Sequence, residues 1–464
     1  MTSEREFNAL LRSWFEESAP SGQPQGLLES VLTATAHTRP RPAWLVGLRG
    51  KPMPETGRSG LNRFASLALV ATVVVVAILI GIGILVRPPN VGPSPVPGPT
   101  HSVTAEPSAS EAPARAASWT ATGNMIEARG GYAGTLLKDG KVLVAGGNIS
   151  SGDSASAELY DPSSGTWAAT GNMVTAMSSP TAAMLLKDGR VLVIGSGSEG
   201  SAELYDPTSG TWTATGNMVT GHFGYAATLL SDGRVLVASE NYNPGVDPVS
   251  AELYDPARGT WTATGGMIAP RFDPAATLLD DGRVLVAGGA TGGDKTYLAS
   301  AEVYDPASGT WTATGDMAVG RGDFTASLLT DGHVLVVGGL NHNGGGIEWA
   351  SAELYDPVSG TWTATGNMGE ARYAHRATLL LDGRVLVAGG FNTDLSGLTA
   401  PLASAELYDP SSGSWSPTAN AIEARAGAAA TLLPDGTVLV AGGFFDINET
   451  PVSTVELYHP GSGS

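Results

Sequence analysis

One pattern is written seven times along the chain, and it restricts the fold more than any other feature. The element Asp-Gly-x-Val-Leu-Val begins at residues 139, 188, 232, 281, 331, 382 and 435. The element Glu-(Leu or Val)-Tyr begins at residues 158, 203, 252, 302, 353, 406 and 456. Self-similarity at a period of about 50 residues is typical of propeller blades, none of which can bury its apolar face alone. The pattern therefore predicts an all-β propeller.

Each unit predicts four short antiparallel strands. In one unit the runs 377–381 and 384–388 flank Asp382-Gly383, and Asp-Gly supplies the positive φ angles of a tight hairpin turn. The third strand carries Ala-Glu-Leu-Tyr and the fourth carries Trp. The Asp-Pro-x-x-Gly between them is typical of an Asx-capped turn. The 62 glycines and 30 prolines fall largely at such fixed places, so they indicate turns rather than low complexity.

A diglycine after an apolar strand, followed by Tyr and then by Trp with six residues between them, resembles the kelch repeat. The residues that carry the resemblance are Gly146-Gly147 with Tyr160 and Trp167, Gly288-Gly289 with Tyr304 and Trp311, Gly338-Gly339 with Tyr355 and Trp362, and Gly389-Gly390 with Tyr408 and Trp415. The Tyr-to-Trp spacing also holds for Tyr205 with Trp212 and Tyr254 with Trp261. The resemblance implies a propeller of the galactose oxidase/kelch type over residues 118–464.

The diglycine is lost at Gly195-Ser196 and at Ser239-Glu240, so we expect blades two and three to be locally irregular. The copper oxidases that resemble this architecture rely on a cysteine-linked tyrosine. Because the chain has no cysteine, we do not expect copper radical chemistry.

The two ends of the repeat region predict how the ring closes. The last unit stops at Tyr458-His459-Pro460, one strand short, whereas residues 118–123 read as a fourth strand that precedes the first unit. Pairing the two completes a seventh blade and protects edges that an open array would expose. The expected fold is thus a seven-bladed kelch-type β-propeller closed by an N-terminal strand.

Residues 1–48 predict a short helical segment. Phe7, Leu10, Leu11, Trp14 and Phe15 share one helix face, and a second apolar stripe follows the break at residues 20–22. One interpretation is a tail whose two stripes pack on each other. The other is a module that docks a cytoplasmic partner.

Residues 64–86 predict a single transmembrane helix, because this uncharged apolar stretch is long enough to cross a bilayer. Arg49, Lys51, Arg58 and Arg63 precede the stretch, and Arg87 alone follows it closely, so the N-terminus is expected in the cytoplasm. Residues 87–117 are rich in Pro, Ser and Ala and predict an extended linker. We expect a single-pass cell-membrane protein with an extracytoplasmic propeller.

The acidic net charge of the chain argues against nucleic acid as a partner. The formal net charge is -19, and the acidic excess lies in the repeat region, which would repel a nucleic-acid backbone. The seven histidines show no metal-ligand spacing, and cysteine ligands are absent. We expect no cofactor and no metal site built from histidine or cysteine; loop acids such as Asp294, Asp394 and Asp446 could bind calcium, although no regular calcium-binding loop occurs.

Loops of an antiparallel blade alternate between its two faces. The 1-2 and 3-4 turns share one face, here named the turn face, and are nearly identical in all units. The 2-3 and 4-1 loops share the other, here named the loop face, and carry the sequence variation. Irregular loops on a repetitive scaffold are where binding is expected, so the loop face is the predicted site.

The 4-1 loops repeat an arginine, with other residues in its position in blades two and three. The residues at this position are Arg129, Met177, His222, Arg271, Arg321, Arg372 and Arg425. One hypothesis is a ring of guanidinium groups at the channel mouth that binds a carboxylate or another anion. The alternative is architectural: each arginine hydrogen-bonds to loop carbonyls of a neighbouring blade.

Non-repeated residues of the loop face are further candidates for ligand contacts. They are Tyr225, Tyr242, Phe272, Asp273, Tyr297, Asp323, His342, Trp349, Tyr373, His375 and Phe445. Aromatic side chains beside carboxylates suit a sugar or a protein partner. We favour a binding module for protein or carbohydrate in signalling or adhesion. The alternative is a hydrolase or epimerase acting on carbohydrate at the channel mouth, with Asp273, Asp323 and His375 as acid and base.

Overall fold

The computed structural model describes residues 116–177, 182–195, 200–222, 224–240, 249–291, 296–341, 347–393 and 397–461. The predicted helical segment 1–48, the predicted membrane span 64–86 and the linker as far as residue 115 lie outside these residues. Within the described ranges, no helix is long and apolar enough to cross a membrane. The propeller belongs to a compact unit, Pro107–Ser464, and is described by itself.

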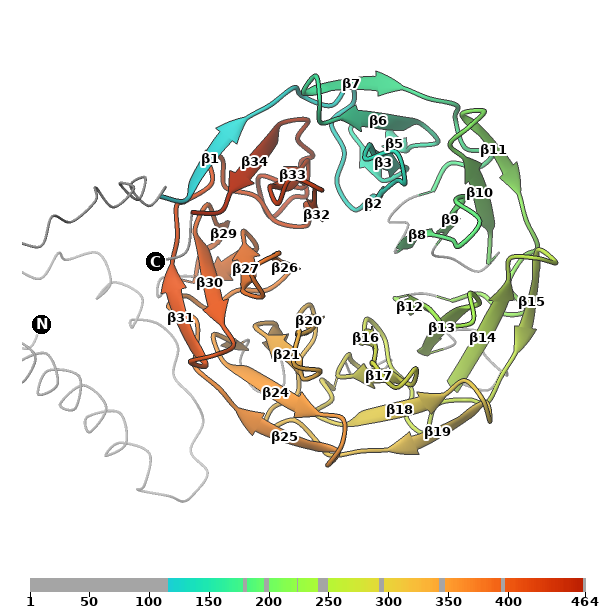
Figure 1. Ribbon diagram of the computed structural model, residues 1–464, viewed down its shortest axis with the longest axis vertical. Coiled ribbons are helices and arrows are strands. Elements are labelled where there is room, and N and C mark those ends of the chain that lie inside the picture. The colour runs from blue at the N-terminus through green and yellow to red at the C-terminus, as the bar shows by residue number, and fades with distance from the viewer. Residues whose placement is uncertain are drawn as a thin grey trace, which may run out of the picture. The chain divides into compact units, whose positions relative to one another are not determined.

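Seven four-stranded antiparallel sheets are arranged in a ring around a central axis, as Figure 1 shows. The innermost strands, whose sequences are mostly Ala-Ala-Thr-Leu or close to it, are β2 (Ala133–Leu136), β8 (Ala182–Leu185), β12 (Ala226–Leu229), β16 (Ala275–Leu278), β20 (Thr325–Leu328), β26 (Arg376–Leu379) and β32 (Ala429–Leu432). The second strands are β3 (Val142–Ala145), β9 (Val191–Ile194), β13 (Val235–Glu240), β17 (Val284–Ala287), β21 (Val334–Val337), β27 (Val385–Ala388) and β33 (Val438–Ala441).

The outer half of each blade carries the Tyr and Trp positions of the repeat. The third strands are β6 (Ala157–Asp161), β10 (Ala202–Asp206), β14 (Val249–Asp255), β18 (Ala301–Asp305), β24 (Ala352–Asp356), β30 (Ala405–Asp409) and β34 (Val455–His459). The fourth strands are β7 (Thr166–Ala169), β11 (Thr211–Ala214), β15 (Thr260–Ala263), β19 (Thr310–Ala313), β25 (Thr361–Ala364), β31 (Ser414–Pro417) and, for the seventh blade, β1 (Ser118–Ala121).

The predicted closure is confirmed, because β1 pairs with β34 and completes the seventh sheet. Ser118 lies opposite His459, and the rings of Trp119 and Tyr458 approach to 5.1 Å between centroids. The seventh blade therefore has the same Tyr–Trp pair as the other six, although its two halves come from opposite ends of the repeat region.

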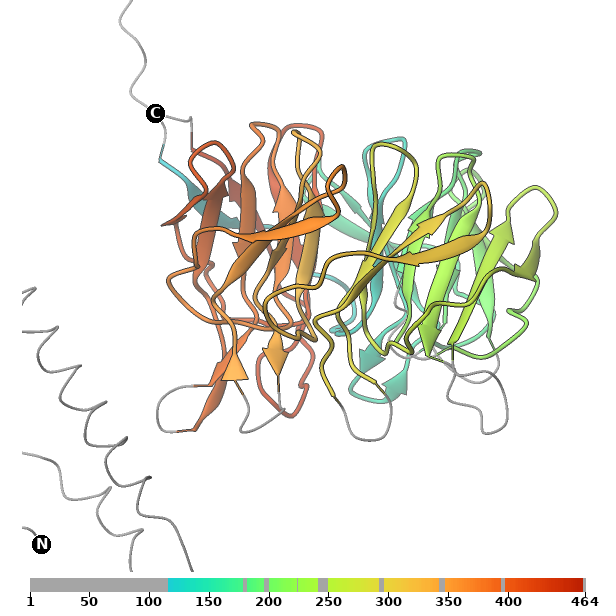
Figure 2. The same ribbon diagram turned by 90° about the horizontal axis from the view of Figure 1, so that it is seen from below.

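Three additional two-stranded hairpins project from the 2-3 loops. They are β4 (Asn148–Ile149) with β5 (Gly152–Asp153), β22 (Leu340–Asn341) with β23 (Ile347–Glu348), and β28 (Phe391–Thr393) with β29 (Thr399–Pro401). Figure 2 shows them on the lower side of the ring, which is the loop face, while the short hairpin turns lie on the upper side. The elaboration of the repeat is thus confined to one face.

The apolar core lies between neighbouring blades. The second strands are buried along their whole length in six blades, as in Val142–Ala145. Leu143 of blade one and Val191 of blade two belong to one buried cluster, and six further clusters are arranged in the same way. Each unit therefore needs its neighbour to bury its Val-Leu-Val strand, as the repeat pattern predicts.

The spacing between Tyr and Trp follows from the register of strands three and four. Tyr160 lies directly opposite Trp167, with ring centroids 5.2 Å apart. The Tyr160 hydroxyl is within 2.8 Å of the Thr122 hydroxyl of the preceding fourth strand, and all seven blades repeat this contact. The repeated aromatic pair therefore joins consecutive blades as well as two strands.

Candidate binding face and channel mouth

A buried glutamate in the third strand of each blade holds the incoming 4-1 loop. The seven carboxylates are Glu158, Glu203, Glu252, Glu302, Glu353, Glu406 and Glu456, all of them buried. In blade one the backbone amides of Ile126 and Glu127 donate to Glu158 at 2.6 and 3.1 Å. The first of these two bonds recurs in every blade. The Glu of the Ala-Glu-Leu-Tyr element is therefore an anchor for the loop.

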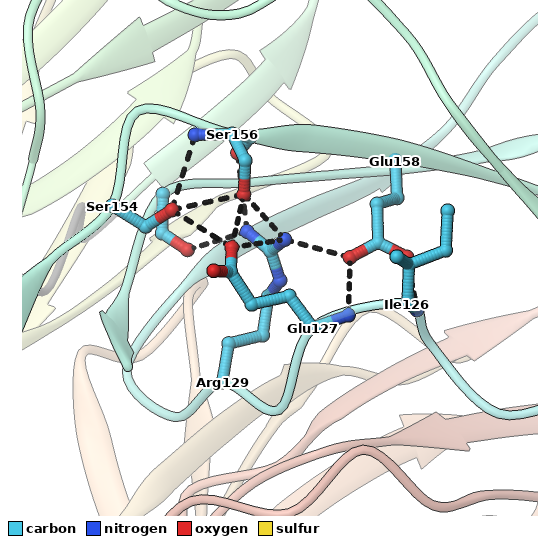
Figure 3. A network of polar contacts seen from close by, with 7 residues as sticks. Ile126, Glu127, Arg129, Ser154, Ser156 and Glu158 are labelled. Atoms are coloured by element: carbon cyan, nitrogen blue, oxygen red, sulfur yellow. Dashed lines mark hydrogen bonds and ion pairs between the residues drawn. The ribbon is translucent and has the colours of Figure 1, made fainter. Parts of the chain in front are cut away.

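The loop arginine completes this network, which Figure 3 shows for blade one. Arg129 Nη2 donates to Glu158 Oε1 at 2.7 Å and to Ser156 Oγ at 2.8 Å. Arg129 Nη1 donates to the carbonyl oxygens of Gly146 at 2.8 Å and Ser156 at 3.1 Å. The guanidinium therefore ties the 4-1 loop to the diglycine, the 2-3 loop and the third strand of the blade that the loop enters.

The same network surrounds the other four loop arginines. Their carboxylate partners are Glu302 for Arg271, Glu353 for Arg321, Glu406 for Arg372 and Glu456 for Arg425. All five guanidinium groups are buried, at 0–2% exposure. Burial lowers the pKa of Arg271, Arg321 and Arg372, and the paired carboxylates oppose this shift. The arginines thus do not line the channel mouth; their geometry favours the architectural alternative.

Blade three carries a matched pair of replacements in this network. His222 takes the arginine position, and Ser239 takes the position of the first glycine. His222 Nδ1 lies 2.6 Å from Ser239 Oγ, and Nε2 lies 3.1 Å from Glu252 Oε1. Burial acts to raise the pKa of Glu252, but hydrogen bonds from His222 and the loop amides outweigh it and hold that pKa below its ordinary value.

Blade three departs from the other blades where its diglycine is lost. β13 continues through Ser239 and Glu240, which pair with Ser250 and Val249. Elsewhere the diglycine ends the strand with positive φ, as at Gly289, where an added Cβ would lie 2.6 Å from the Phe272 carbonyl oxygen. In blade two Met177 is buried and Glu203 accepts from the amides of Val174 and Thr175. Residues 196–199 of that blade lie outside the described residues.

Two residues after the arginine position, the backbone takes up the left-handed conformation. This holds for Gly131, Gly224, Asp273, Asp323, Ala374 and Gly427, with φ between 49° and 60°. The amide of Asp273 donates to Gly224 O at 2.6 Å, and that of Ala374 donates to Asp323 O at 2.9 Å. These bonds connect consecutive blades just before the innermost strands begin, so the six residues lie at the channel mouth.

The acidic candidates come together at this mouth. Desolvation by the protein around the mouth, together with the neighbouring Asp323 carboxylate, raises the pKa of Asp273 to about 6, although the residue as a whole stays exposed. Burial is the main cause that raises the pKa values of Tyr297 and Tyr373; Asp323 adds to the shift of Tyr297, and Glu348 and Asp323 add to that of Tyr373. Both aspartates are exposed, and Phe272 beside them is 40% exposed. The predicted association of carboxylates and aromatic rings is therefore present at one place on the loop face.

Two other candidates, Tyr225 and His375, serve as braces between blades. Tyr225 is buried and donates its hydroxyl to Ile194 O at 2.6 Å. His375 is buried, with Nε2 2.9 Å from Thr325 Oγ1, and burial, reinforced by Arg372, lowers its pKa to about 3. Because His375 is neutral and enclosed, it is a poor acid or base for a ligand in the channel. Trp349 is half-buried, and its amide bonds to Gly339 O at 2.8 Å. Tyr242 and His342 lie outside the described residues.

One functional candidate was missed in the sequence. Arg376 begins β26, where the other innermost strands begin with Ala or Thr, and it is exposed. The protein around the channel lowers its pKa through desolvation, which Tyr132 and Asp323 oppose. A charged residue where the other six repeats have Ala or Thr is the signal that would have identified it.

Exposed apolar side chains are concentrated on the loop face. Large exposed apolar residues there are Ile126, Val174, Val219, Ile268, Phe272, Leu398, Ile422, Phe445 and Ile447. Those on the turn face are Val358 and Leu381. In the parts of the chain that the structure describes, no group of three His, Asp or Glu residues could hold a metal ion.

The blade count, the closure and the diglycine–Tyr–Trp geometry define a seven-bladed β-propeller built from kelch repeats. A family model for the kelch motif matches residues 129–173, 271–318 and 372–421. Each match begins at a loop arginine of the buried network.

Two curated proteins share short segments with the chain. Spermatocyte protein spe-26 of Caenorhabditis elegans is 30% identical over 101 residues, which are 21% of this chain and 17% of that protein. An F-box/kelch-repeat protein of Arabidopsis thaliana is 39% identical over 62 residues, 13% of each chain. The matched segments therefore span less than a fifth of either relative.

Among solved structures, a fungal alcohol oxidase of the AA5 family, in complex with copper, matches with a TM-score of 0.59. The match covers 74% of this chain and 76% of that one at 20% identity. At this identity the likeness shows a shared galactose oxidase-like fold and nothing about activity. Kelch propellers typically act as protein-interaction modules.

Proposed function

We propose that the chain is a membrane-anchored, extracytoplasmic kelch propeller that binds a protein or a carbohydrate through its loop face. The observation that carries the proposal is the difference between the two faces. The loop face holds the three added hairpins and nine of the large exposed apolar side chains among the described residues, including Phe272 and Phe445. A concentration of exposed apolar side chains on one face is a feature of interaction sites.

The absence of cysteine allows a direct test of the face. A photo-cross-linker can be attached to one introduced cysteine, either Phe445→Cys on the loop face or Leu381→Cys on the turn face. Both side chains are exposed, so neither change should disturb the core. In native membranes we expect adducts from position 445 and few from position 381. Equal adducts from both positions would contradict the proposal.

The proposed anchor and orientation rest on residues 64–86 and on the basic residues before them. Single cysteines at Ser21→Cys and Val358→Cys would report the side of the membrane. With a membrane-impermeant maleimide on intact cells, we expect labelling at position 358 and none at position 21 until the cells are permeabilised. The reverse pattern would overturn the orientation.

A second candidate function is favoured by the raised pKa of Asp273. A carboxyl group with a pKa of about 6 next to a second carboxylate is suited to proton transfer, as in a glycoside hydrolase. A panel of chromogenic glycosides, tested with the full chain and with Asp273→Asn and Asp323→Asn, separates the two functions. Turnover that both variants abolish would favour the enzyme, and its absence across the panel would favour the binding module.

A further inference from the structure

We infer that the loop face takes a cationic polypeptide surface that also presents apolar side chains, and that an arc of exposed aliphatic residues is its docking surface. This inference rests on the binding role proposed above and narrows its partner to one class. Three observations lead to it. The aliphatic residues occupy one position in successive loops, the fold does not need their side chains, and the face that carries them is acidic.

The arc occupies one position of the 4-1 loop, directly after the residue in the buried methionine position. Its members are Ile422, Ile126, Val174, Val219 and Ile268, and each is 59–66% exposed. They stand in five successive loops, because blade seven neighbours blade one through the closing strand β1. The remaining two loops carry Ala318 and Gly369, so the arc has two ends.

The fold does not require an aliphatic side chain at this position. Only the backbone amide is used, since it donates to the buried glutamate of the next blade. The amides of Ala318 and Gly369 make the same bond at 2.8 and 2.6 Å, which Ile268 makes at 2.6 Å. Gly369 makes this bond as well as the β-branched residues do. The fold itself therefore does not explain why an apolar side chain is exposed at this position in five loops. A contact with another molecule would use it.

The charge of the loop face, which carries the arc, selects the partner. Exposed acidic residues of the loop face include Asp153, Asp273, Asp316, Asp323, Glu423 and Glu449. Among the described residues of this face, Arg376 is the exposed cation, because the loop arginines are buried in their carboxylate networks. An acidic surface with an aliphatic arc is complementary to lysine and arginine side chains interspersed with apolar ones. The same charge repels the anionic headgroups of a membrane surface.

The test measures binding of a labelled amphipathic helix made of leucine and lysine. The full-length chain is held in nanodiscs of phosphatidylcholine, with empty nanodiscs as the blank, and binding is followed by fluorescence anisotropy. A peptide of the same pattern with glutamate in place of lysine is the matched probe. We expect the lysine peptide to bind the chain more tightly than the glutamate peptide does. Its affinity should fall as the salt concentration is raised. Equal binding of the two peptides would overturn the inference.

Variants locate the binding on the arc. The triple variant Ile126→Ser/Val174→Ser/Val219→Ser should weaken lysine-peptide binding by at least about tenfold, because it removes apolar side chains that the bound peptide would cover. The double variant Val358→Ser/Leu381→Ser makes the same kind of change on the turn face and should leave affinity unchanged. If the triple variant melts early, the single variant Ile268→Ser replaces it, with an expected loss of about threefold. Unchanged affinity in the arc variants would contradict the inference.

Two further outcomes separate this inference from the proposed function. Binding of the full-length chain to phosphatidylserine vesicles that the arc variant abolishes would replace the polypeptide partner with a membrane surface, and so overturn the inference. Adducts from Phe445→Cys in native membranes, without binding of the lysine peptide, would leave the proposed function in place and overturn the inference. If neither adducts from Phe445→Cys nor binding of the lysine peptide were observed, the proposed function would be contradicted as well.

Discussion

The two faces of the propeller are stabilised in opposite ways. On the turn face each aspartate binds a group two residues away, as Asp281 binds the amide of Arg283 at 3.0 Å. On the loop face the anchor is a buried ion pair between residues about thirty positions apart, such as Arg271 with Glu302 at 3.0 Å. Local bonds reproduce the same turn in every blade, whereas long-range bonds hold only the ends of a loop.

This difference explains why variation is confined to one face. The buried network fixes the first part of each 4-1 loop and the start of the third strand, so the residues between the diglycine and that strand are free to differ. The 2-3 loop of blade one forms the hairpin Asn148–Ile149 with Gly152–Asp153, and blade six forms the longer hairpin Phe391–Thr393 with Thr399–Pro401. A face that is anchored from within can carry different surfaces on one scaffold.

The largest expected effect comes from breaking one ion pair on each face. Arg271→Met leaves Glu302 buried without its cation and should lower the free energy of unfolding by about 3 kcal/mol or more. Arg283→Met removes an exposed partner of Asp281, and the cost should stay below about 1 kcal/mol. Urea unfolding followed by tryptophan fluorescence gives both values. Similar costs for the two variants would contradict the comparison.

The second prediction concerns how the free energy of unfolding depends on pH. It compares one histidine from each face. The pKa of His375 is about 3 in the folded chain against an ordinary 6.5, so the unfolded chain binds a proton that the folded chain rejects. Stability should therefore fall as pH drops from 6.5 towards 3, by about 1.4 kcal/mol for each pH unit.

His375→Gln should lose this dependence, as thermal melts at a series of pH values would show. The matched variant His333→Gln changes an exposed histidine on the turn face, and its melting curve should keep the acid dependence of the parent. If the parent and His375→Gln lose stability in parallel below pH 6, the buried neutral histidine is not the cause.

A third effect should be a gain in stability. In blade two, whose buried glutamate is Glu203, the buried Met177 takes the position that an arginine holds in five other blades. Met177→Arg restores the pair found in five other blades and should raise the free energy of unfolding by about 1–2 kcal/mol, the range for hydrogen bonds to charged groups. Met177→Leu is the control and should change stability by less than about 1.5 kcal/mol. A loss of stability in the arginine variant would show that the position has no room for the network.

The smallest effects have opposite signs on the two faces. The pKa of Asp273 is raised to about 6, so its ionisation destabilises the fold as pH rises from 3.8 through 6. Asp273→Asn should be more stable at pH 7 by at most about 1 kcal/mol, because the exposed carboxylate is screened by solvent. On the turn face the Ala307 amide and the Ser308 hydroxyl lower the pKa of Asp305. Asp305→Asn should lose stability at pH 7, and differential scanning calorimetry would show both signs.

Much of the fold could be predicted because it is repeated. The strands, the turns and the closure by residues 118–121 all follow from local patterns that recur with one period. The conformation of blade three is harder to predict, because Ser239, which replaces the first glycine, acts together with a second change. The compensating change, His222 in place of arginine, lies 17 residues away in the sequence and 2.6 Å away in space.

The candidate site was harder to predict, because spacing places a residue in a loop without giving the direction of its side chain. The arginine pattern was identified, but its partner, the Glu of Ala-Glu-Leu-Tyr, was interpreted only as a strand residue. A glutamate repeated seven times between apolar neighbours in a buried strand is the signal that would have paired the two. Spacing gives only the loop in which Asp273 and Asp323 lie, and their proximity depends on the curvature of the ring.

The closing strand also determines the order in which the propeller can be completed. Thr120 reaches His459 across 339 residues, so the seventh sheet cannot form until almost the whole repeat region has been synthesised. Until then β1 has no partner, and the aromatic face of Trp119 stays uncovered. Such an intermediate exposes a strand edge to other chains. During biogenesis, then, protection of residues 118–121 by a chaperone would matter more than protection of any other strand, since their native partner is the last to arrive.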